Sequence, residues 1–194
     1  GKVDFALARG EKKTGPSRQD CVCNIEGVTI EEDLLRRDLT INSIAKNVLT
    51  DTFVDPYNGI QHLRNRVAHP VSDAFKEDSL RVLRAARFCS RYELTPSPEL
   101  LEMCKGLQPT DISNERVGME LYKTMKQAVK PSTFFYFLKE VGWLKYYFKE
   151  VEDLFDIPQS PIYHPEGFCF IHSMLCLDQA TDLFTRVVML CHDL

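Results

Sequence analysis

The chain has 194 residues, of which 44% are hydrophobic and 27% are charged, and its formal net charge is −4. These values predict a soluble globular chain of one domain or parts of two, and the negative charge argues against a protein that coats nucleic acid with its whole surface. No run of residues approaches the roughly 20 apolar positions that a membrane-spanning helix needs, so no membrane contact is expected. Seven cysteines, an odd number in apolar surroundings, indicate reduced thiols and a cytoplasmic location. Because the chain starts with Gly1 rather than methionine, we expect a fragment of a longer protein.

The first 24 residues predict a strand followed by a loop. Residues 3–8 alternate weakly between apolar and polar side chains, which is typical of a strand. On that strand Asp4 would face the side opposite to Val3 and Phe5. The stretch from Arg9 to Asn24 is rich in glycine, lysine and serine, and it predicts a mobile loop.

A helix and a short strand are predicted next. Thr29 and Glu32 have the spacing of a capping box, and the apolar positions favour a helix from Thr29 to about Val48. Asp38 lies beside the apolar side of this helix, so its carboxylate is expected to need a partner. Residues 51–59, with the sequence DTFVDPYNG, then predict a short strand that ends in a turn.

The stretch from residue 76 to residue 88 carries the most informative pattern. It predicts an amphipathic helix on which Asp78, Arg81, Arg84 and Arg87, each three residues apart, form a slanting row. The row offers one carboxylate acceptor and three planar guanidinium donors, which suit a triphosphate or the edge of a base. The same pattern also fits a solvated arginine face with Asp78 as the N-cap, and the helix alone leaves both interpretations open.

The remainder is predicted to be helical until about residue 157. Pro96 and Pro98 end the arginine-rich helix near residue 94. A helix capped by Ser113 should pair Arg116 with Glu120 through i,i+4 spacing. Further helices are expected at residues 99–107, 133–141 and 143–155. The aromatic side chains of the last two favour a hydrophobic core over a platform for base stacking.

Histidines mark the C-terminal segment. His164, His172 and the dipeptide His192-Asp193 follow Pro158 and Pro161. A single histidine is more often structural, but a His-Asp pair after an apolar helix, with another histidine about twenty residues earlier, suits a metal ion held by imidazole and carboxylate. We therefore expect His172, His192 and Asp193 to ligate a divalent transition metal ion.

Four motifs occur in order at residues 32–42 (EDLLRRDLTIN), 55–59 (DPYNG), 77–88 (EDSLRVLRAARF) and 115–121 (ERVGMEL). In this order and spacing they resemble the class II tRNA nucleotidyltransferase and poly(A) polymerase family. Residues 164–193 resemble the opening of the HD domain of the bacterial CCA-adding members. The resemblance extends over essentially the whole chain from Val3.

The resemblance implies an α+β fold that is predominantly α-helical. Residues 1–60 would form the C-terminal part of a polymerase-β-like head, 61–107 a helical neck that recognises the nucleotide, 108–157 a helical body and 158–194 the start of the HD domain. It also implies template-independent addition of CCA to the tRNA 3′ end from CTP and ATP, with Mg²⁺ as the metal ion of nucleotidyl transfer and an HD phosphohydrolase activity beside it.

Residue roles follow from the same resemblance. Asp78 and Arg81 would read the incoming base, Arg84 and Arg87 would lie near the phosphates, and Arg37 would also bind the nucleotide. Asp4 falls where the family often has an acid that supports the metal pair. Ser79 stands where relatives usually have proline or alanine, which should matter little in a first helical turn.

The family's Gly-Gly loop and Asp-x-Asp metal motif would precede Val3, so this chain alone is expected not to catalyse nucleotide addition. The HD segment would likewise need ligands beyond Leu194. Three alternatives remain open. The first is a poly(A) polymerase, which shares the motifs up to Arg87, and the second is a metal-dependent HD phosphohydrolase whose front part only binds substrate. The third is a non-catalytic module that binds tRNA or nucleotides.

Overall fold

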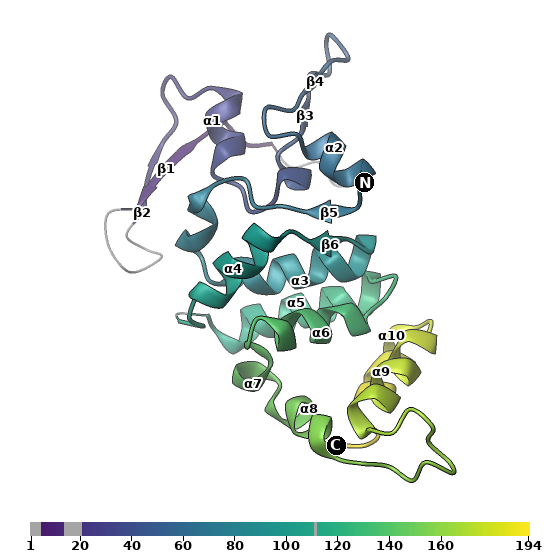
Figure 1. Ribbon diagram of the computed structural model, residues 1–194. Coiled ribbons are helices and arrows are strands. Elements are labelled where there is room, and N and C mark those ends of the chain that lie inside the picture. Colours follow the sequence, from purple (N-terminus) through teal and green to yellow (C-terminus); the bar gives the residue numbers. More distant parts are fainter. Residues whose placement is uncertain (1–4, 14–20, 111) are drawn as a thin grey trace.

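The computed structural model describes residues 5–13, 21–110 and 112–194, and its elements form an elongated stack (Figure 1). The N-terminal part contains β1 (Gly10–Lys13), β2 (Cys21–Asn24), α1 (Ile30–Leu35), a 3₁₀ turn (Thr40–Asn42), β3 (Ala45–Lys46), β4 (Phe53–Val54), α2 (Gly59–Arg64), β5 (Val67–Ala68) and a second 3₁₀ turn (Asp73–Glu77). The central part contains α3 (Leu80–Tyr92), β6 (Thr95–Pro96), α4 (Pro98–Gly106), α5 (Asn114–Gln127) and α6 (Ser132–Glu140). The C-terminal part contains α7 (Leu144–Tyr147), α8 (Lys149–Asp153), a third 3₁₀ turn (Leu154–Asp156), α9 (Cys169–Gln179) and α10 (Leu183–Cys191). The predicted α+β, predominantly helical class is confirmed.

The sheets within the described ranges are small and two-stranded. β1 pairs with β2 and β3 pairs with β4, both antiparallel. β5 and β6, which precede and follow α3 in the sequence, pair in parallel. Figure 1 places the β1–β2 hairpin, α1 and α2 at one end, α3 to α6 in the middle and α9 and α10 at the other end. None of the described helices is both long and apolar enough to cross a membrane.

Two predictions for the N-terminal stretch are wrong. Residues 5–8 are not part of a strand, and Phe5 and Leu7 are 94% and 72% exposed. The stretch predicted as a loop instead contains the antiparallel hairpin, in which Gly10 lies opposite Asn24. Backbone groups make the ladder, so the polar strand β1 can pair with β2 although its own sequence has no alternating apolar pattern. Asp4 lies outside the described residues.

The helix predicted from Thr29 begins as expected but ends early. The Thr29 hydroxyl accepts the Glu32 amide at 3.2 Å, and the Thr29 amide donates to the Glu32 carboxylate at 2.8 Å, which forms the capping box. α1 then ends at Leu35, and Val48 is 87% exposed. The Asp38 carboxylate accepts the amide of the next residue at 2.9 Å, and such a local side-chain bond competes with helix continuation.

Helix α3 is the centre of the molecule. It packs against α5 and α6, and its apolar side, with Val82, Leu83 and Ala86 fully buried, belongs to the main core. The helix ends within two residues of the predicted position. The aromatic residues of α6 and the following segment are core, as predicted: the rings of Phe134, Phe135 and Phe148 meet edge to face.

Later helices follow the sequence with one exception. α4 and α6 match the predicted ranges to within one residue, and α5 begins directly after the predicted cap Ser113. The single helix expected at 143–155 is divided into α7, α8 and a 3₁₀ turn, because Phe148 has a non-helical backbone (φ −138°, ψ 50°) where its ring enters the core. The division into head, neck, body and HD segment stays a prediction.

Candidate functional site

The arginine row on α3 lies where the N-terminal part meets the central helices. Asp78 precedes the helix, and its Oδ1 accepts the Leu80 amide at 3.0 Å, so the carboxylate caps the first turn. Arg81 donates to two backbone carbonyls, that of Ala74 at 2.5 Å and that of Arg36 at 2.7 Å. One guanidinium therefore ties α3 to two segments of the N-terminal part.

Arg84 makes the next link, to Asp38. Its Nε lies 2.6 Å from Asp38 Oδ2, and the Asp38 side chain is only 4% exposed. Burial alone would raise the pKa of Asp38, but the charge of Arg84 and hydrogen bonds from Asn42, Arg84 and the Leu39 amide outweigh it and lower the pKa. The partner that the sequence required for Asp38 is thus a member of the row, 46 positions later in the chain.

The other two members of the row bind α5. Arg116 lies 2.8 Å from Asp78 Oδ2, and Arg87 Nε lies 2.5 Å from Glu120 Oε2. The predicted pairing of Arg116 with Glu120 on one helix is therefore wrong. Arg116 instead pairs with Asp78, just before α3, and Glu120 pairs with Arg87 on α3. The Arg87 and Glu120 side chains are 6% and 3% exposed, and Lys123 reaches the other Glu120 oxygen at 3.1 Å. In this structure Arg87 is a core residue.

Arg37 lies at the edge of this junction. Its guanidinium bonds Asp33 Oδ2 at 3.0 Å and the Asn42 carbonyl at 3.0 Å, and 43% of the side chain is exposed. Partial burial would raise the pKa of Asp33, but hydrogen bonds from Arg36 and Arg37 and from the Arg9 amide lower it. The sequence analysis missed Asp33, although its i,i+3 and i,i+4 spacing to the two arginines was a usable signal.

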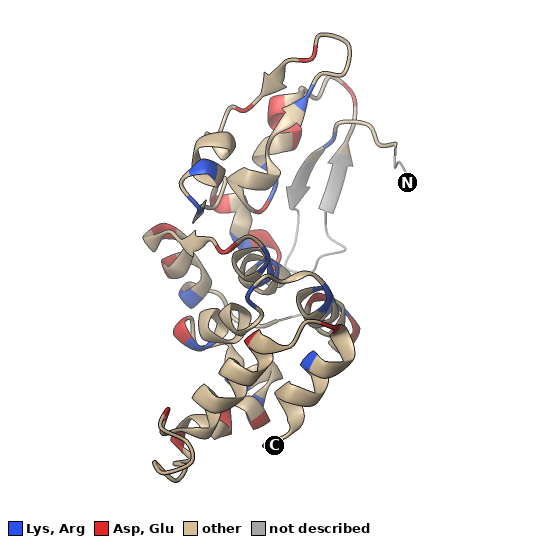
Figure 2. Ribbon diagram, turned by 90° about the vertical axis from the view of Figure 1, so that its right-hand side faces the viewer, with Lys and Arg blue, Asp and Glu red and all other residues tan. Residues whose placement is uncertain are grey.

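A cleft of about 420 Å³ opens beside the junction, between the β1–β2 hairpin, α1 and the segment that precedes α3. Arg36 and Ala74, whose carbonyls accept the bonds from Arg81, both line it, together with Glu32 and Glu77. Acidic and basic residues are interspersed along the ribbon from the N-terminal part to the central helices (Figure 2). The cleft is lined by both polar and apolar groups, and the base-reading candidate Arg81 holds its wall in place through the Arg36 and Ala74 carbonyls.

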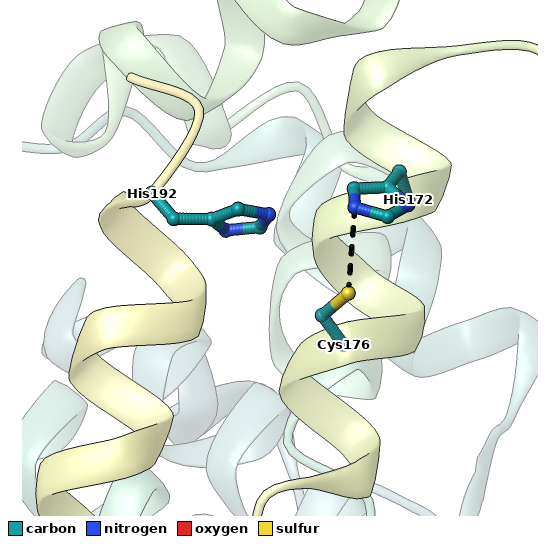
Figure 3. Close-up of side chains that lie close together, drawn as sticks. All are labelled: His172, Cys176 and His192. Atoms are coloured by element: carbon teal, nitrogen blue, oxygen red, sulfur yellow. Dashed lines mark hydrogen bonds between the residues drawn. The ribbon is translucent and has the colours of Figure 1, made fainter. Parts of the chain in front are cut away.

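A second group of side chains lies at the far end of the molecule, where α9 and α10 pack together. His172 and Cys176 come from adjacent turns of α9, and His192 follows α10; their ligand atoms all lie within 4.8 Å of one another (Figure 3). His172 Nε2 is 3.5 Å from Cys176 Sγ, and His172 Nδ1 is 2.5 Å from Glu166 Oε1. The structure thus brings together two of the three predicted metal ligands and adds a cysteine that the sequence analysis missed.

Asp193, the third predicted ligand, lies beside this group. Its Oδ2 is 3.5 Å from His192 Nε2 and accepts the Cys169 thiol at 3.3 Å. Burial raises the pKa of the Cys169 thiol to about 11, and the Asp193 carboxylate adds to this. Burial also raises the pKa of Cys176, with further contributions from Asp193 and Glu166. Only the i,i+4 spacing of His172 and Cys176 could have signalled the cysteine.

Comparisons with known proteins place these features in a family. Residues 1–69 match the model of the poly A polymerase head domain. The whole chain aligns with the Multifunctional CCA protein of Mannheimia succiniciproducens at 39% identity, over 50% of that protein, and with that of Hahella chejuensis at 40% identity, over 48% of it. These matches make the chain similar, over its whole length, to members of the tRNA nucleotidyltransferase and poly(A) polymerase family. It spans about half the length of the curated relatives it matches.

Solved structures share the fold of this chain. The Bacillus stearothermophilus CCA-adding enzyme in complex with CTP is 28% identical, with a TM-score of 0.58 over 69% of this chain and 33% of that one. A CCA-adding enzyme in its apo form II gives a TM-score of 0.62 at 24% identity, over 90% of this chain and 39% of that one. The family predicted from the four motifs is therefore confirmed, while the roles of individual site residues stay predictions.

Proposed function

We propose that this chain serves the template-independent addition of C, C and A to the tRNA 3′ end from CTP and ATP. One observation carries the proposal: all four members of the α3 row bond to residues of the first and fourth motifs or to the segment between them. Asp78 and Arg87 reach Arg116 and Glu120 on α5, whereas Arg84 reaches Asp38. Sequence motifs far apart in the chain thus form one connected junction beside the cleft.

Within this junction we assign Asp78 and Arg81 to the base and Arg37 and Arg84 to the phosphates. A carboxylate and a guanidinium held on one helix can meet the donors and acceptors of a cytosine or adenine edge, and guanidinium groups bind phosphate through two parallel bonds. Arg84 is one-third exposed and can reach a ligand from its place beside Asp38. Arg87 is buried, so it would act beneath that surface by holding α3 against α5.

Nucleotidyl transfer in this family implies a divalent metal ion, and we propose Mg²⁺. Within residues 5–13, 21–110 and 112–194, the groups of three or more side chains able to hold one ion lie only between His164 and His192. None of the described residues before Arg81 belongs to such a group, and the roles assigned above do not depend on the ion. Asp4 is our candidate for an acid that supports the ion, and it lies outside the described residues.

The test is the sequence of the product. A tRNA that lacks its CCA end is incubated with CTP and ATP and the full translation product of the gene, and the extended 3′ ends are sequenced. CCA ends support the proposal, whereas a run of adenosines identifies a poly(A) polymerase. Ends that stay unextended, with tRNA still bound, identify a non-catalytic module.

We also propose a cytoplasmic location for the protein. tRNA matures in the cytoplasm, and free thiols are carried by Cys89, Cys104, Cys169, Cys176 and Cys191.

We also propose a divalent transition metal site in the C-terminal segment, with His172 and His192 as ligands and Asp193 beside them. The histidines fit an ion because they converge from two helices, and when bound the ion would supply a Lewis acid for phosphoester hydrolysis. This chain's own part is to position the ion: Glu166 accepts a hydrogen bond from His172 and fixes its ring. Metal analysis after dialysis and a phosphodiesterase assay test it; His192→Ala should lose both, and a metal-free protein with full activity would exclude the site.

A further inference from the structure

We propose that Cys176 is a thiolate ligand of the ion held by His172 and His192, so that the site takes a borderline-soft ion such as Zn²⁺ rather than Mg²⁺ or Mn²⁺. This inference rests on the proposed metal segment and goes beyond it, because the ligands predicted there offer only nitrogen and oxygen. A sulfur donor changes which ions the site can select.

The position of Cys176 on α9 supports this assignment. It lies four residues after His172, so the two side chains come from adjacent turns of one face of the helix, and His192 approaches from the end of α10 (Figure 3). A helix pair that offers two ligands from one helix and one from the next can hold an ion between them. His172 and Cys176 are half-buried and His192 is exposed, so an ion can reach the three side chains from solvent.

The distance between the donor atoms agrees with shared coordination. In a tetrahedral zinc site, a nitrogen at about 2.0–2.1 Å and a sulfur at about 2.3 Å from the ion lie roughly 3.6 Å apart. His172 Nε2 and Cys176 Sγ are 3.5 Å apart. A hydrogen bond between a thiol and an imidazole has a similar length, so the experiment below must separate the two.

The orientation of His172 favours a ligand over a simple hydrogen-bond partner. Glu166 Oε1 lies 2.5 Å from Nδ1, and this carboxylate also lies 3.4 Å from His164 Nδ1. A carboxylate on one ring nitrogen fixes the tautomer and presents the other nitrogen, here Nε2, as a lone-pair donor toward Cys176 and His192. His164, Glu166 and His172 also form a compact group, but its short contacts already use His172 Nδ1.

Two imidazole nitrogens and one thiolate form a donor set that zinc accepts with a fourth position left for water or another oxygen ligand. Asp193, whose Oδ2 lies 3.5 Å from His192 Nε2, is our candidate for that position. On binding, the ion replaces the thiol proton, which leaves to solvent, so metal uptake should release protons.

Cobalt(II) substitution gives a direct readout of the sulfur ligand. The chain of residues 1–194 is titrated with Co²⁺ as the wild type, as Cys176→Ser, and as the control Cys191→Ser, which removes an exposed thiol next to His192. We expect a sulfur-to-cobalt charge-transfer band in the wild type and in the control and its loss in Cys176→Ser. Loss of a residue that only supports a metal ligand weakens metal binding by roughly 10–100-fold. Because Cys176 would be a ligand itself, Cys176→Ser should weaken Zn²⁺ binding by at least this much.

The outcomes separate this inference from the metal segment itself. If the wild type binds Co²⁺ without the charge-transfer band and no more tightly than Cys176→Ser, Cys176 is not a ligand, but the proposed histidine site stands. Wild-type protein that binds no ion overturns both. Circular dichroism of each variant confirms that a lost band does not reflect unfolding.

Discussion

Replacing Arg87 by methionine should destabilise the fold strongly, because it leaves the Glu120 carboxylate buried and without its main partner. The substitution keeps most of the side-chain volume and removes the charge. Breaking a buried ion pair from one side costs about 3–5 kcal/mol. Lys123 still reaches one Glu120 oxygen at 3.1 Å, so we expect a loss of about 3 kcal/mol, at the lower end of that range.

The measurement is urea unfolding of the chain followed by circular dichroism, with the free energy of unfolding taken by linear extrapolation. The double variant Arg87→Met/Glu120→Met should recover to within about 1 kcal/mol of the wild type, since an apolar pair can replace a buried ion pair. Arg91→Met is the control: Arg91 lies on the same helix as Arg87, its exposed bond goes to Gln127 of α5, and its loss should change stability by less than about 0.5 kcal/mol. A single variant as stable as the wild type, or a double variant no better than the single one, would refute the reasoning.

Two further predictions concern the contacts around the N-terminal part. Gly59→Ala should destabilise by about 1–3 kcal/mol, because the added Cβ would lie 2.2 Å from the Thr40 carbonyl oxygen. In contrast, Gly118→Ala should stabilise α5 by about 0.5–1 kcal/mol in the same urea assay, because its added Cβ meets nothing within 4 Å. If both substitutions change the free energy of unfolding equally, the clash at Gly59 is excluded. The lowered pKa of Asp38 predicts stability that is fully present above its ordinary value of 3.8 and is lost as pH falls through the lower folded pKa. Urea midpoints measured against pH should therefore fall in acid more steeply for the wild type than for Asp38→Asn, which cannot titrate beside Arg84; parallel curves would contradict this.

The features that the sequence predicted correctly are local ones. The capping box of α1 and the serine cap of α5 depend on residues within one helical turn, and so does the apolar face of α3. The pairing of Asp38 depends instead on Arg84, which lies 46 positions later in the chain. No periodicity within a single helix contains that information.

The candidate sites show the same division. The row of one carboxylate and three arginines is visible in the spacing, but the assignment of Arg116 to Asp78 and of Glu120 to Arg87 requires α3 and α5 to be packed together. Cys176 was missed for a related reason: a cysteine in an apolar helix resembles a core residue until the second helix brings His192 to it.

The most direct test of the central claim is nucleotide binding by the chain itself. Calorimetry with CTP, ATP, GTP and UTP at low and high salt should show weak binding of CTP and ATP that declines as salt rises, because charge-assisted phosphate contacts are screened. Asp78→Ala and Arg81→Ala should each weaken that binding by about tenfold or more and reduce the preference for these two nucleotides, since a base edge loses its acceptor or donor. Equal affinity for all four nucleotides, unchanged in both variants while circular dichroism shows them folded, would contradict the account.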